Sequence, residues 1–171
     1  LPPPLPPGPR TALLLGDSLP PELPARLRLP GVTLHVHPLP PPPDLRPAPG
    51  QERAQFVFLI YTAGDLLHTH GDPARLLAQA RAVVESLAER HPAAEVILSS
   101  VPPSREQHGR LNARILDLDR GLLALAEERG LPWIDLHGML RDDLAPRPAI
   151  DPRYSRDGLH LSDSACRRFR D

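Results

Sequence analysis

Two short segments near opposite ends of the 171-residue chain contain residue types that together could cleave an ester. Gly16-Asp17-Ser18-Leu19 follows a short apolar run, and Asp157-Gly158-Leu159-His160 lies near the C-terminus. A serine hydroxyl attacks an acyl carbon efficiently only when a base takes its proton, and a histidine held by a carboxylate is such a base. The spacing lets Asp157 hold one ring nitrogen of His160 while the other nitrogen faces Ser18.

Each of these residues also has a purely structural interpretation. Serine is a common helix N-cap, so Ser18 by itself fits a cap as well as it fits a nucleophile. A single histidine such as His160 is more often an ordinary surface residue of a loop. The prediction that Ser18 is a nucleophile therefore depends on a fold that brings the two ends of the chain together.

Strands and helices alternate along the chain. Apolar runs predict strands over residues 11–15, 31–36, 55–61, 95–101 and 132–136. Apolar residues at helical spacing predict helices from Pro73 to about His91, with Asp72 as N-cap, and over residues 106–129. This alternation predicts an α/β fold: a three-layer α/β/α flavodoxin-like sandwich with a mainly parallel five-stranded sheet in the order 2-1-3-4-5.

The predicted strand order also determines where the reactive residues lie. The first and third strands are neighbours at the point where the order reverses, so the loops after Leu15 and Tyr61 meet over the carboxyl ends of the strands. Ser18 lies in the first of these loops. The 157–160 segment follows the fifth strand and can return to the same edge, so we expect any active site there.

Taken together, the Gly16–Leu19 and Asp157–Leu161 segments resemble blocks I and V of the SGNH/GDSL hydrolases, over nearly the whole domain. The resemblance implies a hydrolase of esters, thioesters or acetyl groups on sugars or lipids, with no metal or other cofactor. It implies Ser18 as nucleophile, His160 as base and Asp157 as the residue that orients it. More loosely, residues 156–162 and 132–135 are similar to esterase-like domains of animal retroelement proteins.

The chain departs from this family's pattern at two places that concern the oxyanion hole. Gly64 of Thr62-Ala63-Gly64-Asp65 stands where the family has an asparagine after the third strand. A proline run over 38–43 stands where it has a glycine after the second, and proline has no N–H to donate. We predict the backbone N–H groups of Ser18 and Gly64 as donors, supported by Asp17 and Asp65.

Because losing oxyanion donors slows serine hydrolases strongly, the departures leave a second interpretation open. In that alternative the chain is a catalytically weakened or inactive SGNH-fold domain that acts as a binding or assembly module. A carboxylic-ester hydrolase working through an acyl-enzyme is the leading prediction. Its expected substrate is a small-molecule, lipid or sugar ester.

Composition limits the partners and the environment. The net charge of −1 argues against direct nucleic-acid binding, and no apolar run is long enough to span a membrane. Cys166 is the single cysteine, so an internal disulfide is excluded. We expect a soluble, intracellular protein.

The remaining predictions concern the domain boundaries and the side chains that solvent surrounds. Residues 1–10 form a proline-rich linker and a candidate docking segment for a polyproline-binding partner, while residues 11–171 form the hydrolase-like domain, expected to stop within its last helix. The histidines at 35, 37, 68 and 70 are expected to be solvated rather than to bind a metal. Asp117, Asp119 and Arg120 are expected on an exposed helix face.

Overall fold

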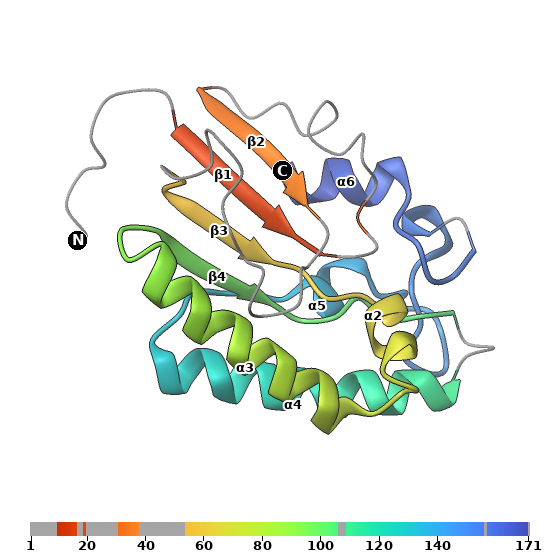
Figure 1. The fold of residues 1–171 in the computed structure, drawn as a ribbon. Helices are drawn as coiled ribbons and strands as arrows, with labels where there is room; N and C mark the ends of the chain where they lie inside the picture. Colours follow the sequence, from red (N-terminus) through yellow and green to blue (C-terminus); the bar gives the residue numbers. More distant parts are fainter. Residues whose placement is uncertain are drawn as a thin grey trace.

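A computed structural model of the chain describes residues 10–16, 19, 31–37, 54–105, 109–155 and 157–170 (Figure 1). The strands are β1 (Arg10–Leu15), β2 (Val32–His37), β3 (Phe56–Leu59), β4 (Glu95–Ser99) and β5 (Trp133–Ile134). The α-helices are α2 (Ala63–His68), α3 (Pro73–Arg90), α4 (Gly109–Arg129), α5 (Leu136–Leu140) and α6 (Asp163–Arg170), with a short 3-10 helix, η3 (Pro152–Tyr154).

The five strands form one sheet in the order β2-β1-β3-β4-β5, and every neighbouring pair is parallel. The predicted order and direction of the strands are therefore confirmed. β1 is bordered by β2 on one side and by β3 on the other, with Leu13 opposite both His35 and Val57. The carboxyl ends of β1 and β3 are thus adjacent, as the strand order requires.

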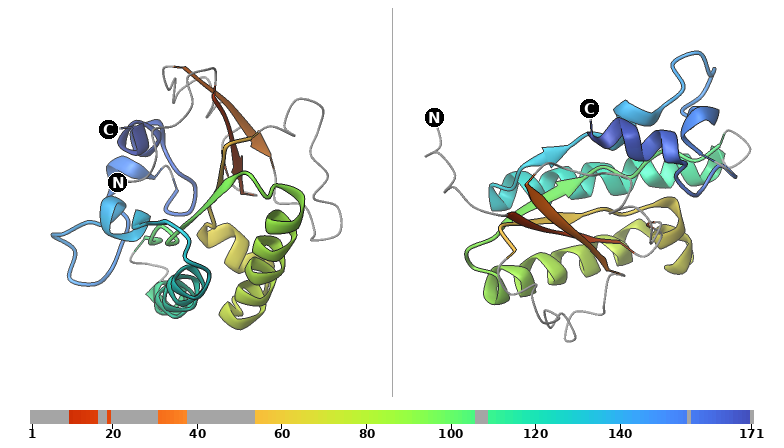
Figure 2. Two further views of the ribbon diagram at one scale, coloured as in Figure 1. Left: turned by 90° about the vertical axis from the view of Figure 1, so that its left-hand side faces the viewer. Right: turned by 90° about the horizontal axis from the view of Figure 1, so that it is seen from above.

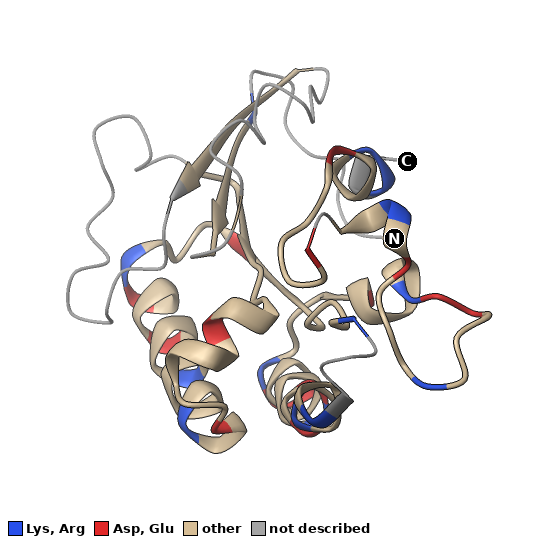
Figure 3. Ribbon diagram, turned by 90° about the vertical axis from the view of Figure 1, so that its right-hand side faces the viewer, with Lys and Arg blue, Asp and Glu red and all other residues tan. Residues whose placement is uncertain are grey.

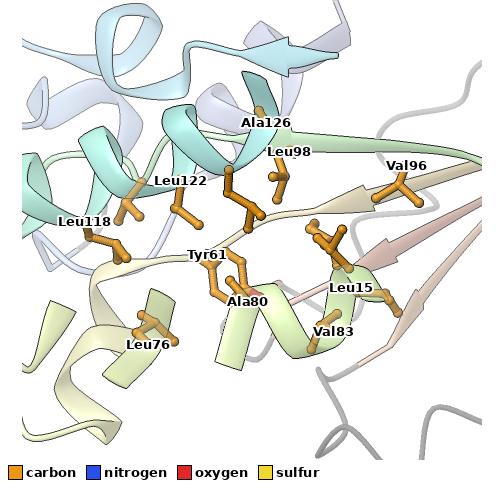
Figure 4. Close-up of a cluster of buried hydrophobic side chains, with 14 of the residues drawn as sticks. Leu15, Tyr61, Leu76, Ala80, Val83, Val96, Leu98, Leu118, Leu122 and Ala126 are labelled. Carbon is orange, nitrogen blue, oxygen red and sulfur yellow. The ribbon is translucent and has the colours of Figure 1, made fainter. Parts of the chain in front are cut away.

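The sheet has helices on both of its faces (Figure 2). Leu13, Leu15 and Leu59 belong to the main core, which α3 and α4 cover on one face of the sheet (Figure 4). Leu14 belongs to a second cluster on the other face, together with Leu136 of α5 and Cys166 of α6. Because successive strand side chains point to opposite faces, this alternation buries β1 on both sides and gives the predicted three-layer architecture.

The two long helices have the predicted amphipathic pattern. Asp72 caps α3 by accepting hydrogen bonds from the N–H groups of Ala74 (3.0 Å) and Arg75 (3.3 Å), and Pro73 occupies the first helical position. The buried residues of α3 are Leu76, Ala80, Val83, Val84 and Leu87, and those of α4 include Leu111, Ile115, Leu118, Leu122 and Leu125. The N-cap and the burial pattern of α3 confirm the sequence prediction.

Each strand differs from its predicted range at one end or at both ends. β1 begins at Arg10, which we expected in the proline-rich linker. β3 ends at Leu59, three residues before Thr62, the N-cap of α2, and β4 ends at Ser99. β5 ends at Ile134, because Asp135, the N-cap of α5, follows immediately. In α5 the carboxylate of Asp135 accepts a hydrogen bond from the Gly138 N–H (2.8 Å), so Leu136 belongs to a helix instead of the fifth strand.

The described surface carries charges of both signs. Figure 3 looks onto the edge to which the strands point, and the basic and acidic residues drawn there are interspersed. Among the described residues, no helix combines the length and apolarity that crossing a membrane would require.

Candidate active site

The segments that follow β1, β3 and β4 all leave the sheet at its carboxyl edge. The chain continues from β1 through Gly16, from β3 into Thr62 and α2, and from β4 into residues 100–105. The C-terminal segment joins this edge through two backbone hydrogen bonds, from the Ile150 N–H to the Ser104 carbonyl (3.1 Å) and from the Arg105 N–H to the Gly158 carbonyl (3.1 Å). The C-terminal segment therefore lies beside the loop that follows β4 at this edge.

Asp157 and His160 form a close pair in the bend before α6. Oδ2 of Asp157 lies 2.6 Å from Nδ1 of His160, and Oδ1 accepts hydrogen bonds from the N–H groups of His160 (2.8 Å) and Leu159 (2.9 Å). The His160 N–H, then the imidazole and the Leu159 N–H, hold the pKa of Asp157 well below its usual range, against the opposing effect of burial. A carboxylate in this state can orient a histidine at neutral pH.

Gly158 gives the bend its shape. Its φ of +88° lies in the region that residues with a Cβ rarely adopt, and a Cβ placed on it would lie 2.3 Å from Cγ of Arg105. Glycine is therefore required between Asp157 and Leu159 both by the backbone conformation and by the close approach of the loop after β4.

Gly64 and Asp65 lie in the first turn of α2, at the carboxyl end of β3. The Asp65 carboxylate is buried and accepts hydrogen bonds from the backbone N–H of Thr62 (2.6 Å) and from its hydroxyl (2.8 Å). The N–H of Gly64 belongs to the first turn, where no carbonyl of the same helix is available to it. Asp65 therefore starts the helix on which the predicted donor Gly64 lies.

Ser18 and Asp17 lie outside the described residues, but the residues that flank them are described. A Cβ placed on Gly16 would lie 2.5 Å from the carbonyl oxygen of Ile60, so the chain leaves β1 in close contact with the end of β3. Leu19 is buried in the cluster that contains Cys166 of α6, the helix that follows His160. Both flanking residues thus lie at the edge that the Asp157–His160 bend also reaches.

Two polar side chains of α4 hold the loop after β4, in roles that the sequence pattern did not indicate. Asp119 accepts a hydrogen bond from the Val101 N–H (2.6 Å) and lies 3.1 Å from Nδ1 of His137. Its side chain is only 13% exposed, so the expectation of an exposed Asp119 is wrong. The reason is that it accepts a backbone N–H of the loop after β4, a contact that a charged-residue pattern cannot reveal.

Asn112 holds the other end of the same loop. Its Oδ1 accepts hydrogen bonds from the N–H (2.7 Å) and hydroxyl (2.8 Å) of Ser104, and its Nδ2 donates to the carbonyls of Ser104 (3.1 Å) and Pro148 (2.6 Å). Asn112 is seven positions before Asp119, two helical turns away and so on a similar face of α4. The sequence signal for these two roles was the seven-residue spacing of polar residues beside the apolar stripe of the helix.

In the described part of the chain, no three side chains of histidine, cysteine, aspartate or glutamate gather as ligands for a metal ion. His35 and His37 lie on β2, His68 ends α2, and Asp72 is engaged as the N-cap of α3. The neighbouring His70 has a positive φ of 57° in the turn between α2 and α3.

The sequence matches the model of the GDSL-like lipase/acylhydrolase family over residues 14–168. This range includes both the segment around Ser18 and the Asp157–His160 pair. No curated protein matches the chain significantly.

Solved structures share the fold at low sequence identity. A GDSL-like lipase from Bacteroides thetaiotaomicron superimposes with a TM-score of 0.74 at 16% identity, covering 94% of this chain and 84% of that one. A lipase/acylhydrolase from Enterococcus faecalis gives 0.69 at 20%, covering 94% and 91%. A carbohydrate acetylesterase from Sinorhizobium meliloti gives 0.62 at 16%, covering 93% and 94%. These likenesses establish the fold.

Proposed function

This chain belongs to the GDSL-like lipase/acylhydrolase family, and from that premise we propose that it hydrolyses carboxylic esters through an acyl-enzyme formed on Ser18. The observation that carries the proposal is the contact of 2.6 Å between Asp157 and Nδ1 of His160, at the edge where the flanks of Ser18 lie. Because Asp157 engages Nδ1, Nε2 is the nitrogen that takes the serine proton.

The reaction proceeds in two steps. The Ser18 hydroxyl oxygen attacks the ester carbonyl while His160 takes its proton, and the imidazolium then gives that proton to the departing alcohol. Water attacks the acyl-enzyme in the second step, losing a proton to His160, and the proton returns to Ser18 as the carboxylic acid leaves. Asp157 remains ionised throughout and stabilises the imidazolium.

The backbone N–H groups of Ser18 and Gly64 are the proposed donors to the oxyanion. The first-turn position of Gly64 leaves its N–H free of the helical hydrogen-bond ladder, which supports this role.

The most useful first substrates are acetyl esters of sugars, since proteins of the same fold include a carbohydrate acetylesterase and an acetyl xylan esterase. Short-chain lipid esters are the second class to test.

A fluorophosphonate probe tests the proposed nucleophile directly. We expect stoichiometric labelling of the folded protein, with the adduct on the peptide that contains Ser18, because the probe reacts with serines that a neighbouring base activates. Intact-mass and peptide mass spectrometry give the measurement. Ser18→Ala should abolish labelling, whereas Ser164→Ala, which removes a serine of α6, should label like the wild type. A folded wild type that takes no label would overturn the proposal.

Gly64 favours a second candidate function, a weakly active domain used for binding, and also offers a way to test it. Gly64→Asn adds a side-chain amide where the family has one, and we expect kcat for p-nitrophenyl acetate to rise about 100-fold. Gly64→Ala is the matched control, since it keeps the N–H, adds no donor and should change kcat little. An equal rate for all three proteins would show that this donor is not what limits turnover.

A further inference from the structure

We propose that Ser155 is a positioning residue for the Asp157–His160 pair, and that its hydroxyl holds the bend in which the carboxylate meets the imidazole. The inference rests on the proposed function, because the pair matters for catalysis only if His160 is the base. It adds a residue that touches neither the substrate nor the reacting atoms.

The Asp157–His160 pair needs support because solvent surrounds much of it. The side chains of Asp157 and His160 are 52% and 60% exposed, yet Oδ2 and Nδ1 are held 2.6 Å apart. Exposed ion pairs contribute little to stability on their own, since water screens the attraction and ordering two side chains costs entropy. The geometry of this pair must therefore be maintained by the backbone that carries it.

Ser155 lies buried beneath that backbone and bonds to it at two points. Its Oγ accepts a hydrogen bond from the Gly158 N–H (2.7 Å) and donates one to the carbonyl of His160 (2.9 Å). One hydroxyl thus connects the residue after Asp157 to His160 itself. At 4% exposure, Ser155 is shielded from water that would otherwise compete for both bonds.

Neighbouring contacts also hold the 155–161 segment together. Ser155 pairs with Leu161 in an isolated antiparallel bridge, which brings the two ends of the 155–161 segment together. The Gly158 carbonyl accepts a hydrogen bond from the Arg105 N–H, so both backbone polar groups of Gly158 have partners. Loss of the Ser155 hydroxyl would leave the Gly158 N–H and the His160 carbonyl without this partner while the bridge and the Arg105 contact remain.

A double-mutant cycle separates positioning from a general contribution to folding. We expect Ser155→Ala to lower kcat for p-nitrophenyl acetate about tenfold with KM little changed. In the Asp157→Asn background the same substitution should have almost no further effect, because that variant already keeps a proton on Nε2 of His160, so that positioning the ring no longer helps it to act as a base. An equal tenfold loss in both backgrounds, or no loss in the wild-type background, would overturn the proposal.

Two further variants keep the test decisive. Ser162→Ala removes a nearby hydroxyl that bonds to the Arg153 carbonyl (2.6 Å) instead of to the bend, and it should retain the wild-type kcat. Ser155→Cys nearly preserves the side-chain volume while offering only weak sulfur hydrogen bonds, so it should show the same direction of effect even if Ser155→Ala does not fold.

Amide hydrogen exchange gives a readout that does not require activity. The N–H groups of Leu159 and His160 donate to Asp157, and we expect both to exchange at least about tenfold faster in Ser155→Ala but not in Ser162→Ala. Unchanged exchange would overturn the positioning role. If wild type and His160→Ala hydrolysed esters equally, the proposed function would fail, and the exchange data would still decide whether Ser155 holds the bend.

Discussion

Replacement of His160 by alanine is expected to lower kcat for p-nitrophenyl acetate by about 10⁵-fold, a larger loss than we expect from any change to Asp157. Loss of the base leaves Ser18 as a neutral hydroxyl, and single losses within serine–histidine units of this kind cost about 10⁶ in turnover. KM should change little, because His160 contributes to proton transfer more than to substrate binding. Steady-state kinetics on the purified variant provide the measurement.

His137→Ala is the matched control for this prediction, because the chain contains a second histidine–aspartate pair. His137 lies 3.1 Å from Asp119, but its side chain is only 13% exposed and its Nδ1 also lies 3.2 Å from the Val101 carbonyl. We expect this variant to keep kcat within a few-fold of the wild type, provided that circular dichroism shows it folded. Similar losses in both variants would refute the assignment of His160 as the base.

Asp157→Asn is expected to reduce kcat by about 10⁴-fold, the second largest effect. The Asn amide can still accept the N–H groups of Leu159 and His160 through its oxygen, so the bend should persist. Its nitrogen, however, would donate to Nδ1 of His160. The imidazole proton would then stay on Nε2, and Nε2 could not accept the proton of the serine hydroxyl. Steady-state kinetics check the loss of activity. An unchanged near-ultraviolet circular dichroism spectrum checks that the bend persists.

The pH dependence gives this prediction a second measurement. The depressed pKa of Asp157 means that its ionised form stabilises the bend above the ordinary aspartate pKa and that this stabilisation is lost only as pH falls through the lower, folded-state value. Any wild-type decline of kcat on mild acidification should therefore not come from protonation of Asp157, and the bend should stay folded. Loss of near-ultraviolet ellipticity in the same pH range would contradict this interpretation.

The sequence was sufficient to predict the features that depend on local pattern. Apolar runs separated by amphipathic helices indicated the parallel sheet and its order, and Asp72-Pro73 identified the start of α3. The three-residue spacing of Asp157 and His160 was enough to predict their contact, because residues this close in a bend share one local geometry. The assignment of Ser18 as nucleophile stays a prediction.

Contacts between segments distant in sequence were not predictable in the same way. Ser155 resembles any serine in a loop, and its two bonds depend on a bend shaped by Gly158 and by Arg105, fifty positions earlier. The helices α2 and α5 have only six and five residues, too few for an apolar period to stand out. Their N-caps, Thr62 and Asp135, were visible, but such residues are equally frequent in turns.

The attachment of the loop after β4 to α4 restricts how this protein can diverge. Asp119 and Asn112, both on α4, accept hydrogen bonds from the N–H groups of Val101 and Ser104 at the two ends of this loop. The next residue, Arg105, donates its N–H to the bend that carries His160. Inserting or deleting a single residue between positions 112 and 119 would rotate one anchor by about 100° relative to the other. Substitutions can therefore accumulate on the outer surface of α4. The number of residues between Asn112 and Asp119 is fixed, because both side chains must reach the loop that contacts the His160 bend.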